Sequence, residues 1–250
     1  MCLIVFAWRP GHEVPLVLAA NRDEFYARPT LPLAKWEDAP GVLAGRDLEA
    51  GGTWLGAGPK GRFAALTNIR DPRTPPVGRT RGELCVQFLQ GEMGPGEFLA
   101  DALRRAGDYS GFNLLVGDDR ELWFLNPRSG GPINLKAGIY GISNADLDTP
   151  WPKVERGKAA LAECLDPPST DSLLNLLHDP EQAPDHILPE TGVGLNTERM
   201  LSSVFIATRT YGTRASSALI VRADGSRELV ERSYGPYGAK LGDVRMELRD

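Results

Sequence analysis

The sequence is poor in the side chains that build disulfide frameworks and metal sites. Its 250 residues include three cysteines and three histidines. Cys2, Cys85 and Cys164 are odd in number and far apart, which excludes a disulfide framework or a Cys-x-x-Cys site. The histidines lack metal-ligand spacing, and none is paired with a nearby cysteine. We therefore expect no metal site and no other cofactor.

Long apolar runs and an excess of basic charge are also missing. The longest apolar runs, such as residues 3–8 and 218–221, are far too short to span a bilayer, and no basic stretch precedes the first as in a signal peptide. The net charge of -5 and the sequence pI of 5.4 give no electrostatic reason to expect a nucleic-acid or membrane partner. These features predict a cytoplasmic protein that binds no nucleic acid and has no integral membrane segment.

The chain reads as one folding unit. It contains no repeat and no low-complexity linker, and 250 residues can bury a sizeable core. We therefore predict a single domain over residues 1–250. Short apolar runs with β-branched or aromatic residues predict strands. They lie at residues 3–7, 15–20, 54–57, 62–67, 113–116, 122–125, 203–208, 217–221 and 228–231.

Turn signals and helical spacing predict how these strands are arranged. Polar turn residues separate the first two strands and the last two, which predicts two antiparallel hairpins. Because the strands lie in groups around predicted helices, we expect an α+β fold with antiparallel sheets and helices packed outside. Apolar residues at helical spacing place the helices at residues 83–89, 97–105, 154–165 and 169–177. Proline-rich stretches at residues 71–76, 166–168 and 180–189 predict loops that form a mobile rim.

Cys2 directly follows the initiator methionine, at the start of an apolar strand. A thiol attacks as its thiolate, so a catalytic cysteine needs a cation or a base nearby. If Met1 is removed, residue 2 gains an α-amine with a pKa of about 7.7 to 8.0, which is a usable base at neutral pH. Cys2 could then supply both nucleophile and base. The alternative is a half-buried cysteine at a strand end, a common place for cysteine.

The second predicted strand ends in Asn-Arg-Asp-Glu at residues 21–24. Hairpin pairing would bring this segment beside Cys2. Arg22 could stabilise a thiolate, and Asp23 could orient or accept a hydrogen bond from the α-amine. The alternative is a polar turn with an internal salt bridge, which contributes little to stability if it is exposed. The expected closeness to Cys2 favours the functional interpretation.

Eight motifs in order along the chain resemble one known family. They are the N-terminal MC, NRDEF at 21–25, GGTWLG at 51–56, ALTN at 65–68, RGEL at 81–84, GFNLL at 111–115, YGISNA with TPWPK at 140–153, and YGTRASSALIV at 211–221. Together they look like the NRDE family, which includes the eukaryotic transport and Golgi organization protein 2. That family is in turn distantly similar to N-terminal nucleophile (Ntn) hydrolases of the penicillin V acylase and bile salt hydrolase group.

The distant resemblance implies a fold and the first half of a site. The fold would be a four-layer αββα sandwich of two antiparallel sheets flanked by helices, with the nucleophile at the end of a central strand. In the acylase group a cysteine nucleophile is followed by an arginine and an aspartate at the end of the second strand. Cys2, Arg22 and Asp23 match this pattern.

Three later residues complete the site that the resemblance implies. Asn68 resembles the asparagine that helps to form the oxyanion hole, and Asn144 resembles the one that contacts the amine of the nucleophile. Arg214 is the best match to a late arginine. The alternative for each asparagine is a turn cap at a strand end, a position that asparagine favours. The alternative for Arg214 is a surface residue on a strand.

Two functions follow from these resemblances. The first is hydrolysis of a non-peptide C–N amide bond in a small acylated metabolite, through an acyl-enzyme formed on Cys2. The second is a non-catalytic carrier on the same fold. Members of the eukaryotic branch have been linked to haem handling and to lipid or acyl-coenzyme A metabolism, so the chain could bind haem or a hydrophobic metabolite without cleaving it.

Overall fold

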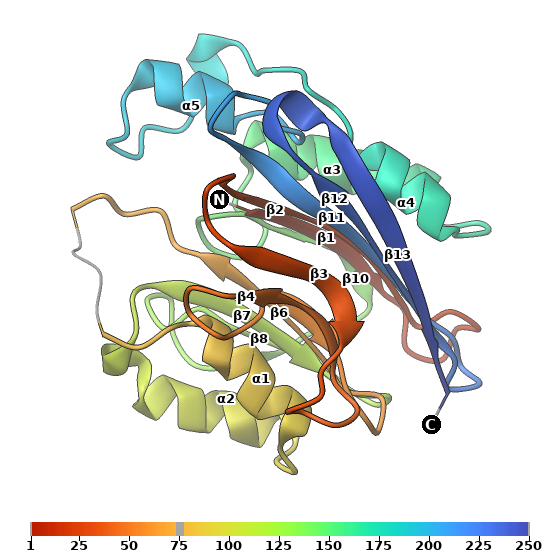
Figure 1. Ribbon diagram of the computed structural model, residues 1–250. Coiled ribbons are helices and arrows are strands. Elements are labelled where there is room, and N and C mark those ends of the chain that lie inside the picture. Colours follow the sequence, from red (N-terminus) through yellow and green to blue (C-terminus); the bar gives the residue numbers. More distant parts are fainter. Residues whose placement is uncertain (1, 74–77, 250) are drawn as a thin grey trace.

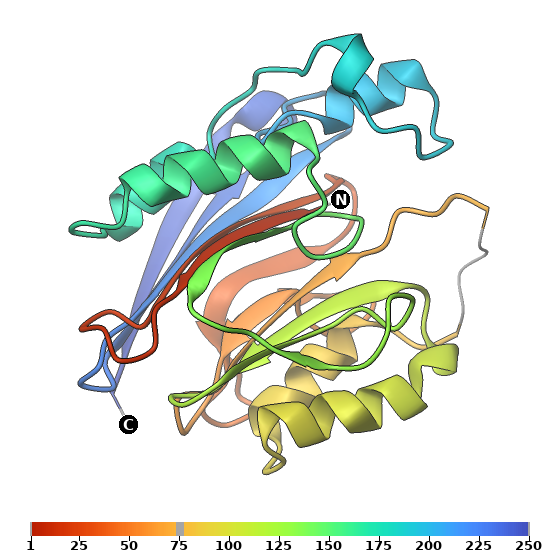
Figure 2. The same ribbon diagram turned by 180° about the vertical axis from the view of Figure 1, so that it is seen from behind.

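Two antiparallel β-sheets packed face to face form the centre of the molecule, and helices cover the outer face of each (Figure 1, Figure 2). The computed structural model describes residues 2–73 and 78–249. Within these residues the layers follow the order helix, sheet, sheet, helix. The predicted α+β fold, a four-layer αββα sandwich, is therefore confirmed.

The first sheet has six strands in the described chain and carries the N-terminal strand inside it, away from its edges. Their spatial order is β10 (Gly138–Ile142), β1 (Cys2–Trp8), β2 (Leu16–Phe25), β11 (Tyr211–Val221), β12 (Arg227–Tyr234) and β13 (Lys240–Leu248). Two helices pack on its outer face, and a third lies near the end of the sheet where the chain begins (Figure 1). They are α3 (Pro152–Glu163), α4 (Thr170–Leu176) and α5 (Leu195–Leu201).

The second sheet has seven strands in the described chain and is covered by two helices on its outer face (Figure 2). Its order is β3 (Thr30–Lys35), β4 (Leu43–Asp47), β5 (Leu55–Ala57), β6 (Phe63–Asn68), β7 (Phe112–Gly117), β8 (Leu122–Leu125) and β9 (Ile133–Asn134). The covering helices are α1 (Gly82–Gln90) and α2 (Pro95–Arg104). Short 3-10 turns lie at Ala106–Asp108, Asp185–Ile187 and Pro236–Gly238.

The continuous apolar run of β1 is explained by burial on both of its faces. Side chains of a strand alternate between the two faces of the sheet. Ile4 and Phe6 pack into the core between the two sheets, whereas Leu3 and Val5 pack into the core beneath α3 and α4. Successive residues of β1 therefore point alternately into these two cores. The polar residues at the strand ends follow the same alternation.

Most of the predicted elements are confirmed. Both predicted hairpins form, β1 with β2 and β11 with β12. The predicted strand at residues 203–208 is wrong, because residues 203–205 are bends that follow α5 and only Ala207 of this segment forms a bridge, an isolated one to Gly212. They look like a strand because their apolar side chains are buried. Phe205, for example, packs on the rings of His178 and Tyr234 rather than joining a ladder.

The elements missed by the sequence patterns have weak periodicity. The outer strands β3 and β13 are largely exposed, so their residues do not form an apolar run. Helix α5 spans only seven residues and buries few of them. The predicted loop at 166–168 is a loop, and the one at 180–189 contains a 3-10 turn. Residues 74–76 of the predicted loop at 71–76 lie outside the described residues.

Glu231 is a buried carboxylate where the two sheets meet. It lies on β12 and is 4% exposed. Its carboxylate accepts a hydrogen bond of 2.8 Å from the backbone N–H of Leu33, which belongs to the opposite sheet. Burial raises the pKa of Glu231 to about 7, because the charged form is disfavoured away from water.

This buried carboxylate should make the stability of the fold depend on pH. Between pH 4.5 and 7 the unfolded chain loses this proton while the folded protein keeps it. The free energy of unfolding should therefore fall as pH rises through this window. At about 1.4 kcal/mol per pKa unit, the loss is about 3 kcal/mol relative to Glu231→Gln, which does not titrate. Urea unfolding of both proteins at pH 4.5 and about pH 8 measures it, and equal pH dependence would contradict the expectation.

Candidate active site

The register of the first hairpin decides which polar side chains meet. Cys2 pairs with Arg22 across β1 and β2, and side chains of directly paired residues share one face of a sheet. Cys2, Arg22 and Glu24 therefore continue the face that lies between the two sheets. Asn21 and Asp23 alternate with them and belong to the face beneath the helices. The four polar residues of the NRDE segment thus point in two directions, two of them into the space between the sheets and two toward the helices.

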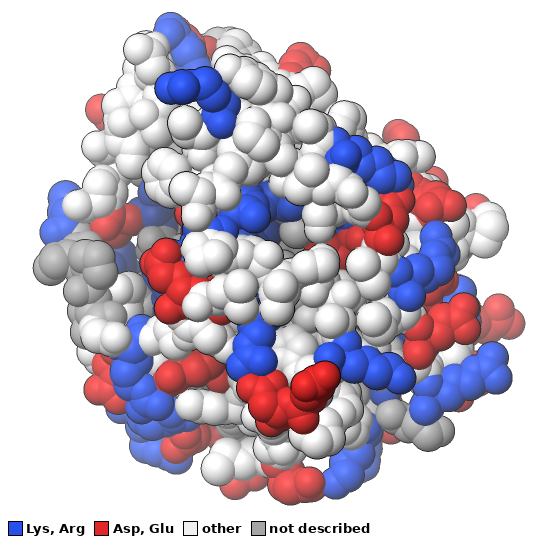
Figure 3. Space-filling view, in the orientation of Figure 1, with Lys and Arg blue, Asp and Glu red and all other residues white. Residues whose placement is uncertain are grey.

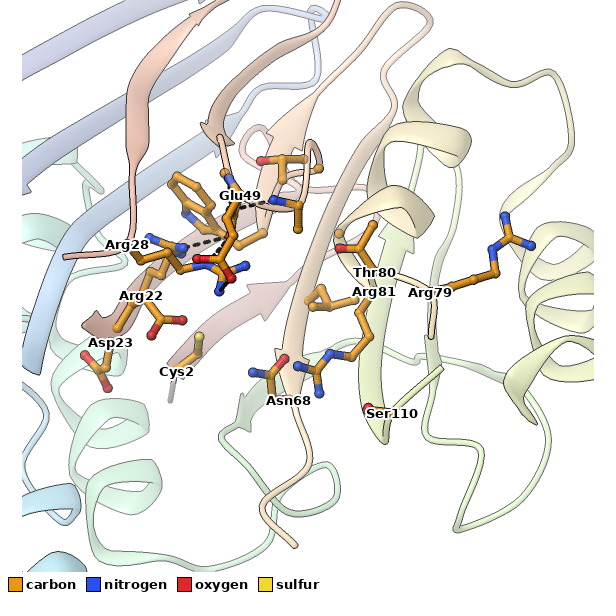
Figure 4. A pocket seen from close by; sticks show the side chains of 18 of the residues that line it. Cys2, Arg22, Asp23, Arg28, Glu49, Asn68, Arg79, Thr80, Arg81 and Ser110 are labelled. Atoms are coloured by element: carbon orange, nitrogen blue, oxygen red, sulfur yellow. Dashed lines mark hydrogen bonds and ion pairs between the residues drawn. The ribbon is translucent and has the colours of Figure 1, made fainter. Parts of the chain in front are cut away.

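A cavity of about 400 Å³ opens where Cys2 and Arg22 reach the end of the sandwich. Its walls come from β1 and β2, from β4, β6 and the loops beside them, and from the segment that leads into α1 (Figure 4). Charged side chains of both signs line much of it. Figure 3 shows basic side chains within a recess near the place where Figure 1 marks the N-terminus.

Asn144 holds the backbone of Cys2 in place from behind the cavity. Its side-chain oxygen accepts a hydrogen bond of 3.3 Å from the backbone nitrogen of Cys2. Its amide nitrogen donates 2.7 Å to the carbonyl of Asn68 at the end of β6. Ser143 adds a hydroxyl that donates 2.9 Å to the carbonyl of Cys2. Asn144 is 1% exposed, so this amide links the first residue of β1 to the second sheet from within the protein.

The segment that carries Asn144 is itself fixed by buried polar contacts. The side-chain nitrogen of Asn113 donates 2.6 Å to the carbonyl of Ala145 and 3.0 Å to the hydroxyl of Thr67. Thr67 in turn donates 2.5 Å to the carbonyl of Ser143. Asn113 lies in the GFNLL motif, and the motif alone did not reveal this role, because the contact joins segments far apart in the sequence.

Asn68 presents its side chain to the cavity (Figure 4). It is the last residue of β6 and is partly exposed. Within residues 2–73 and 78–249 its amide group has no protein hydrogen-bond partner. An uncharged N–H donor beside a cysteine is suited to an oxyanion that forms only during a reaction.

Arg22 is held tightly by groups other than the thiol. Its guanidinium lies 4.4 Å from the centre of the Trp54 ring. It donates hydrogen bonds of 3.2 Å to the Asp47 carboxylate and 3.3 Å to the Thr30 hydroxyl. Asp47 also accepts 2.7 Å from Arg28. Burial alone would raise the pKa of Asp47, but the hydrogen bond from Arg28 and the two positive charges lower it. Arg22 and Arg28 therefore share the negative charge of Asp47.

Asp23 lies against a lysine beneath helix α3. The Lys153 ammonium is 3.9 Å from the Asp23 carboxylate, and both side chains are almost completely buried. The Thr213 hydroxyl donates 2.8 Å to the same carboxylate. Burial raises the pKa of Asp23 and lowers the pKa of Lys153, while their mutual attraction favours the charged forms. Lys153 is the last residue of the TPWPK motif, in which spacing alone did not single it out.

A second buried ion pair lies next to this one. The Arg70 guanidinium is 2.6 Å from the Glu198 carboxylate, and their side chains are 3% and 5% exposed. Arg70 also stacks over the Trp151 ring at 4.6 Å. Glu198 belongs to α5, which the sequence patterns missed, so this pair could not be predicted.

Arg214 is placed apart from the Cys2 cavity. It is the extra residue of a bulge in β11, between Thr213 and Ala215. Its guanidinium donates to the carbonyls of Phe25, Tyr26 and Arg28 and lines a neighbouring cavity of about 260 Å³. Of the six predicted site residues, four line one cavity, Asn144 contacts Cys2 from behind it, and Arg214 faces the neighbouring cavity. The four are Cys2, Arg22, Asp23 and Asn68.

Among residues 2–73 and 78–249, no three His, Cys, Asp or Glu side chains are grouped so that they could hold a metal ion. In the same residues, no helix is both long and apolar enough to cross a bilayer.

Fold and site together define a class of protein, an αββα sandwich with a cysteine at the start of an inner strand and a polar cavity in front of it. Residues 1–236 match the model of the family described as Transport and Golgi organisation 2, and the chain belongs to this family. It is 36% identical to the human Transport and Golgi organization protein 2 homolog and 35% identical to the mouse homolog, with 93% of each chain covered. The Drosophila melanogaster protein is 29% identical, with 95% of each chain covered.

Two solved structures are similar to this chain over most of its length. Penicillin V acylase from Agrobacterium tumefaciens is 9% identical with a TM-score of 0.49, over 90% of this chain and 82% of that one. A mutant conjugated bile acid hydrolase from Clostridium perfringens is 9% identical with a TM-score of 0.48, over 99% of this chain and 92% of that one.

The buried pair of Asp23 and Lys153 predicts a strong coupling in stability. Lys153→Met leaves a buried carboxylate without its ammonium neighbour and should cost about 3–5 kcal/mol. Asp23→Asn together with Lys153→Met removes both charges and should cost clearly less than the two single changes added together. Urea unfolding of the four proteins of this double-mutant cycle measures the coupling. Additive costs would show that the two groups do not depend on each other.

Proposed function

We propose that this protein is an N-terminal nucleophile hydrolase that cleaves the C–N amide bond of a small acylated metabolite, with Cys2 as nucleophile. One observation supports this most. The nitrogen of Cys2 is held by Asn144, and Cys2 lines a cavity together with Asn68, whose side-chain amide has no hydrogen-bond partner among the described residues. The proposed nucleophile with its amine, the residue that holds this amine and the proposed oxyanion donor thus come from three segments that meet at one place.

The first step of the proposed mechanism needs the α-amine of Cys2. Met1 lies outside the described residues, and its removal would turn the backbone nitrogen of Cys2 into that amine. The nitrogen already lies where the Asn144 side-chain oxygen accepts a hydrogen bond. In the free-base form the amine takes the thiol proton, and the thiolate attacks the substrate carbonyl. In this proposal Asp23 stabilises the protonated amine, and Arg22 keeps the neighbouring charges fixed.

The remaining steps use the same groups. Asn68 donates to the oxyanion of the tetrahedral intermediate, and the protonated amine gives its proton to the leaving nitrogen as the C–N bond breaks. Water then attacks the thioester of the acyl-enzyme, with the amine accepting a proton from it. The C–S bond then breaks, the acid leaves, and the protonated amine returns its proton to the thiolate, which restores the thiol. The proposal assigns no role in these steps to Arg214, which faces the neighbouring cavity.

The charged lining of the cavity favours this proposal over a carrier of haem or of a lipid. Sites for hydrophobic ligands are lined mainly by apolar and aromatic side chains. Here ion pairs such as Arg22 with Asp47 and Arg28 with Glu49 form much of the wall. A small polar amide is better suited to such a site.

Cys2 should be the residue that becomes acylated. On protein isolated from its native cell, intact mass should show that Met1 is absent, and p-nitrophenyl hexanoate should add one hexanoyl group to Cys2. Cys2→Ala should abolish both the adduct and the release of nitrophenolate. Cys164→Ala is the matched control, because Cys164 is also a partly exposed thiol. Retention of Met1, or labelling that survives Cys2→Ala, would falsify the mechanism.

Asn68→Ala should slow the reaction without unfolding the protein. Loss of one oxyanion donor lowers kcat by about 100- to 1,000-fold. Steady-state hydrolysis of p-nitrophenyl hexanoate measures this change, with KM expected to move much less than kcat. Asn134→Ala, on the exposed short strand β9, is the control and should leave kcat unchanged. A kcat for Asn68→Ala within a factor of about three of the parent would remove Asn68 from the mechanism.

A further inference from the structure

We propose that Arg81 binds an anionic group of the substrate, so that the amide cleaved at Cys2 carries a carboxylate or a similar oxyanion. This inference rests on the proposed function and adds the class of substrate to it. Arg81 opens the RGEL motif and lines the same cavity as Cys2. The motif could not show where this arginine points.

Close packing of two glycine segments brings Arg81 to the cavity. A Cβ on Gly52 would lie 2.4 Å from the carbonyl carbon of Gly82, a distance that no side chain can occupy. The backbone N–H of Thr53 donates 3.2 Å to the carbonyl of Gly82. The GGTWLG and RGEL motifs therefore pack backbone against backbone, and α1 begins at the wall of the cavity.

The guanidinium of Arg81 is fixed beside the proposed oxyanion donor. It donates 3.2 Å to the carbonyl of Gly111, which also accepts 3.0 Å from the backbone N–H of Ile69. Ile69 directly follows Asn68. Figure 4 shows the Arg81 side chain extending toward Asn68, on the side of Cys2 that is away from Asp23. A substrate with its carbonyl between Cys2 and Asn68 would therefore extend toward Arg81.

Arg81 differs from the other arginines of the cavity in its partners. Arg22 and Arg28 are paired with Asp47, and Arg79 lies 2.6 Å from Glu83. In the described part of the chain, Arg81 has no carboxylate within 4.0 Å. A partly buried cation without a counterion costs free energy, which an incoming anion would recover.

Glu24 limits where that anion can lie. Its carboxylate also lines the cavity, on the β2 side, and accepts 2.8 Å from the backbone N–H of Phe25. It forms no ion pair with the described residues, so its charge would repel an anion placed nearby. The anionic group is therefore expected on the α1 side. There the flat fork of the Arg81 guanidinium can donate two parallel hydrogen bonds to one carboxylate.

Binding to the Cys2→Ala protein tests this inference without any chemistry. The probes are two matched pairs. N-hexanoylglycine and N-hexanoylglycinamide differ in charge on the amine side of the amide, and glutaric acid monoanilide and its methyl ester differ on the acyl side. Isothermal titration calorimetry should show that the carboxylate of at least one pair binds about 10- to 100-fold more tightly than its neutral twin.

Variants in the same Cys2→Ala background assign that preference to Arg81. Arg81→Met should reduce the ratio of the two affinities to about one, whereas Arg81→Lys should keep part of it because the charge remains. Arg79→Met is the matched control and should keep the full ratio, since Arg79 is already paired with Glu83. Circular dichroism checks that each variant is folded.

The outcomes separate this inference from the proposed function. Equal or undetectable binding of both members of each pair overturns the inference, and so does a preference that survives Arg81→Met. If the binding preference depends on Arg81 but the parent protein shows no acylation of Cys2, the anion site stands and the hydrolase proposal fails. If acylation occurs without any preference, the hydrolase proposal stands and the anion site fails.

Discussion

The antiparallel register of β1 and β2 is the constraint on which the site depends. Because Cys2 lies opposite Arg22, the period of two along each strand sends Arg22 and Glu24 into the space between the sheets. The same period sends Asn21 and Asp23 beneath the helices. A shift by one residue would exchange these sets and turn the side chains that fit one core toward the other. The apolar residues of the hairpin therefore fix the position of the polar ones.

The buried polar side chains of β2 show how this register is maintained. Asn21 donates to the carbonyls of Leu177 and Val204, and Asp23 faces Lys153. Each polar group that β2 turns toward the helices thus meets a group supplied by the helical layer. Without such a partner, each of these buried polar groups would lower the stability of the fold by several kcal/mol. The NRDE segment can lie in the interior only because residues between 153 and 204 provide these partners.

The sequence predicted the strands and helices whose apolar pattern is strong, and it predicted that Cys2 and Arg22 would meet. It could not predict contacts made by single polar residues across long separations. Lys153 and Asn113 belong to recognised motifs, but nothing in a motif says which distant group a side chain will reach. The strand predicted at residues 203–208 is wrong for the opposite reason, because apolar side chains can be buried without joining a sheet.

The cavity depends on both sheets and on one helix start, so no single motif creates it. β1 supplies the cysteine, β2 and β4 with the residues that follow them supply the ion pairs of the wall, β6 supplies Asn68, and the close contact of Gly52 with Gly82 positions Arg81. Asn144, which holds Cys2 and Asn68 together, lies outside the cavity itself. Motifs spread from residue 2 to the segment after β10 are therefore parts of one structure. A change in the packing of the two sheets would alter the cysteine, the amide and the arginine together.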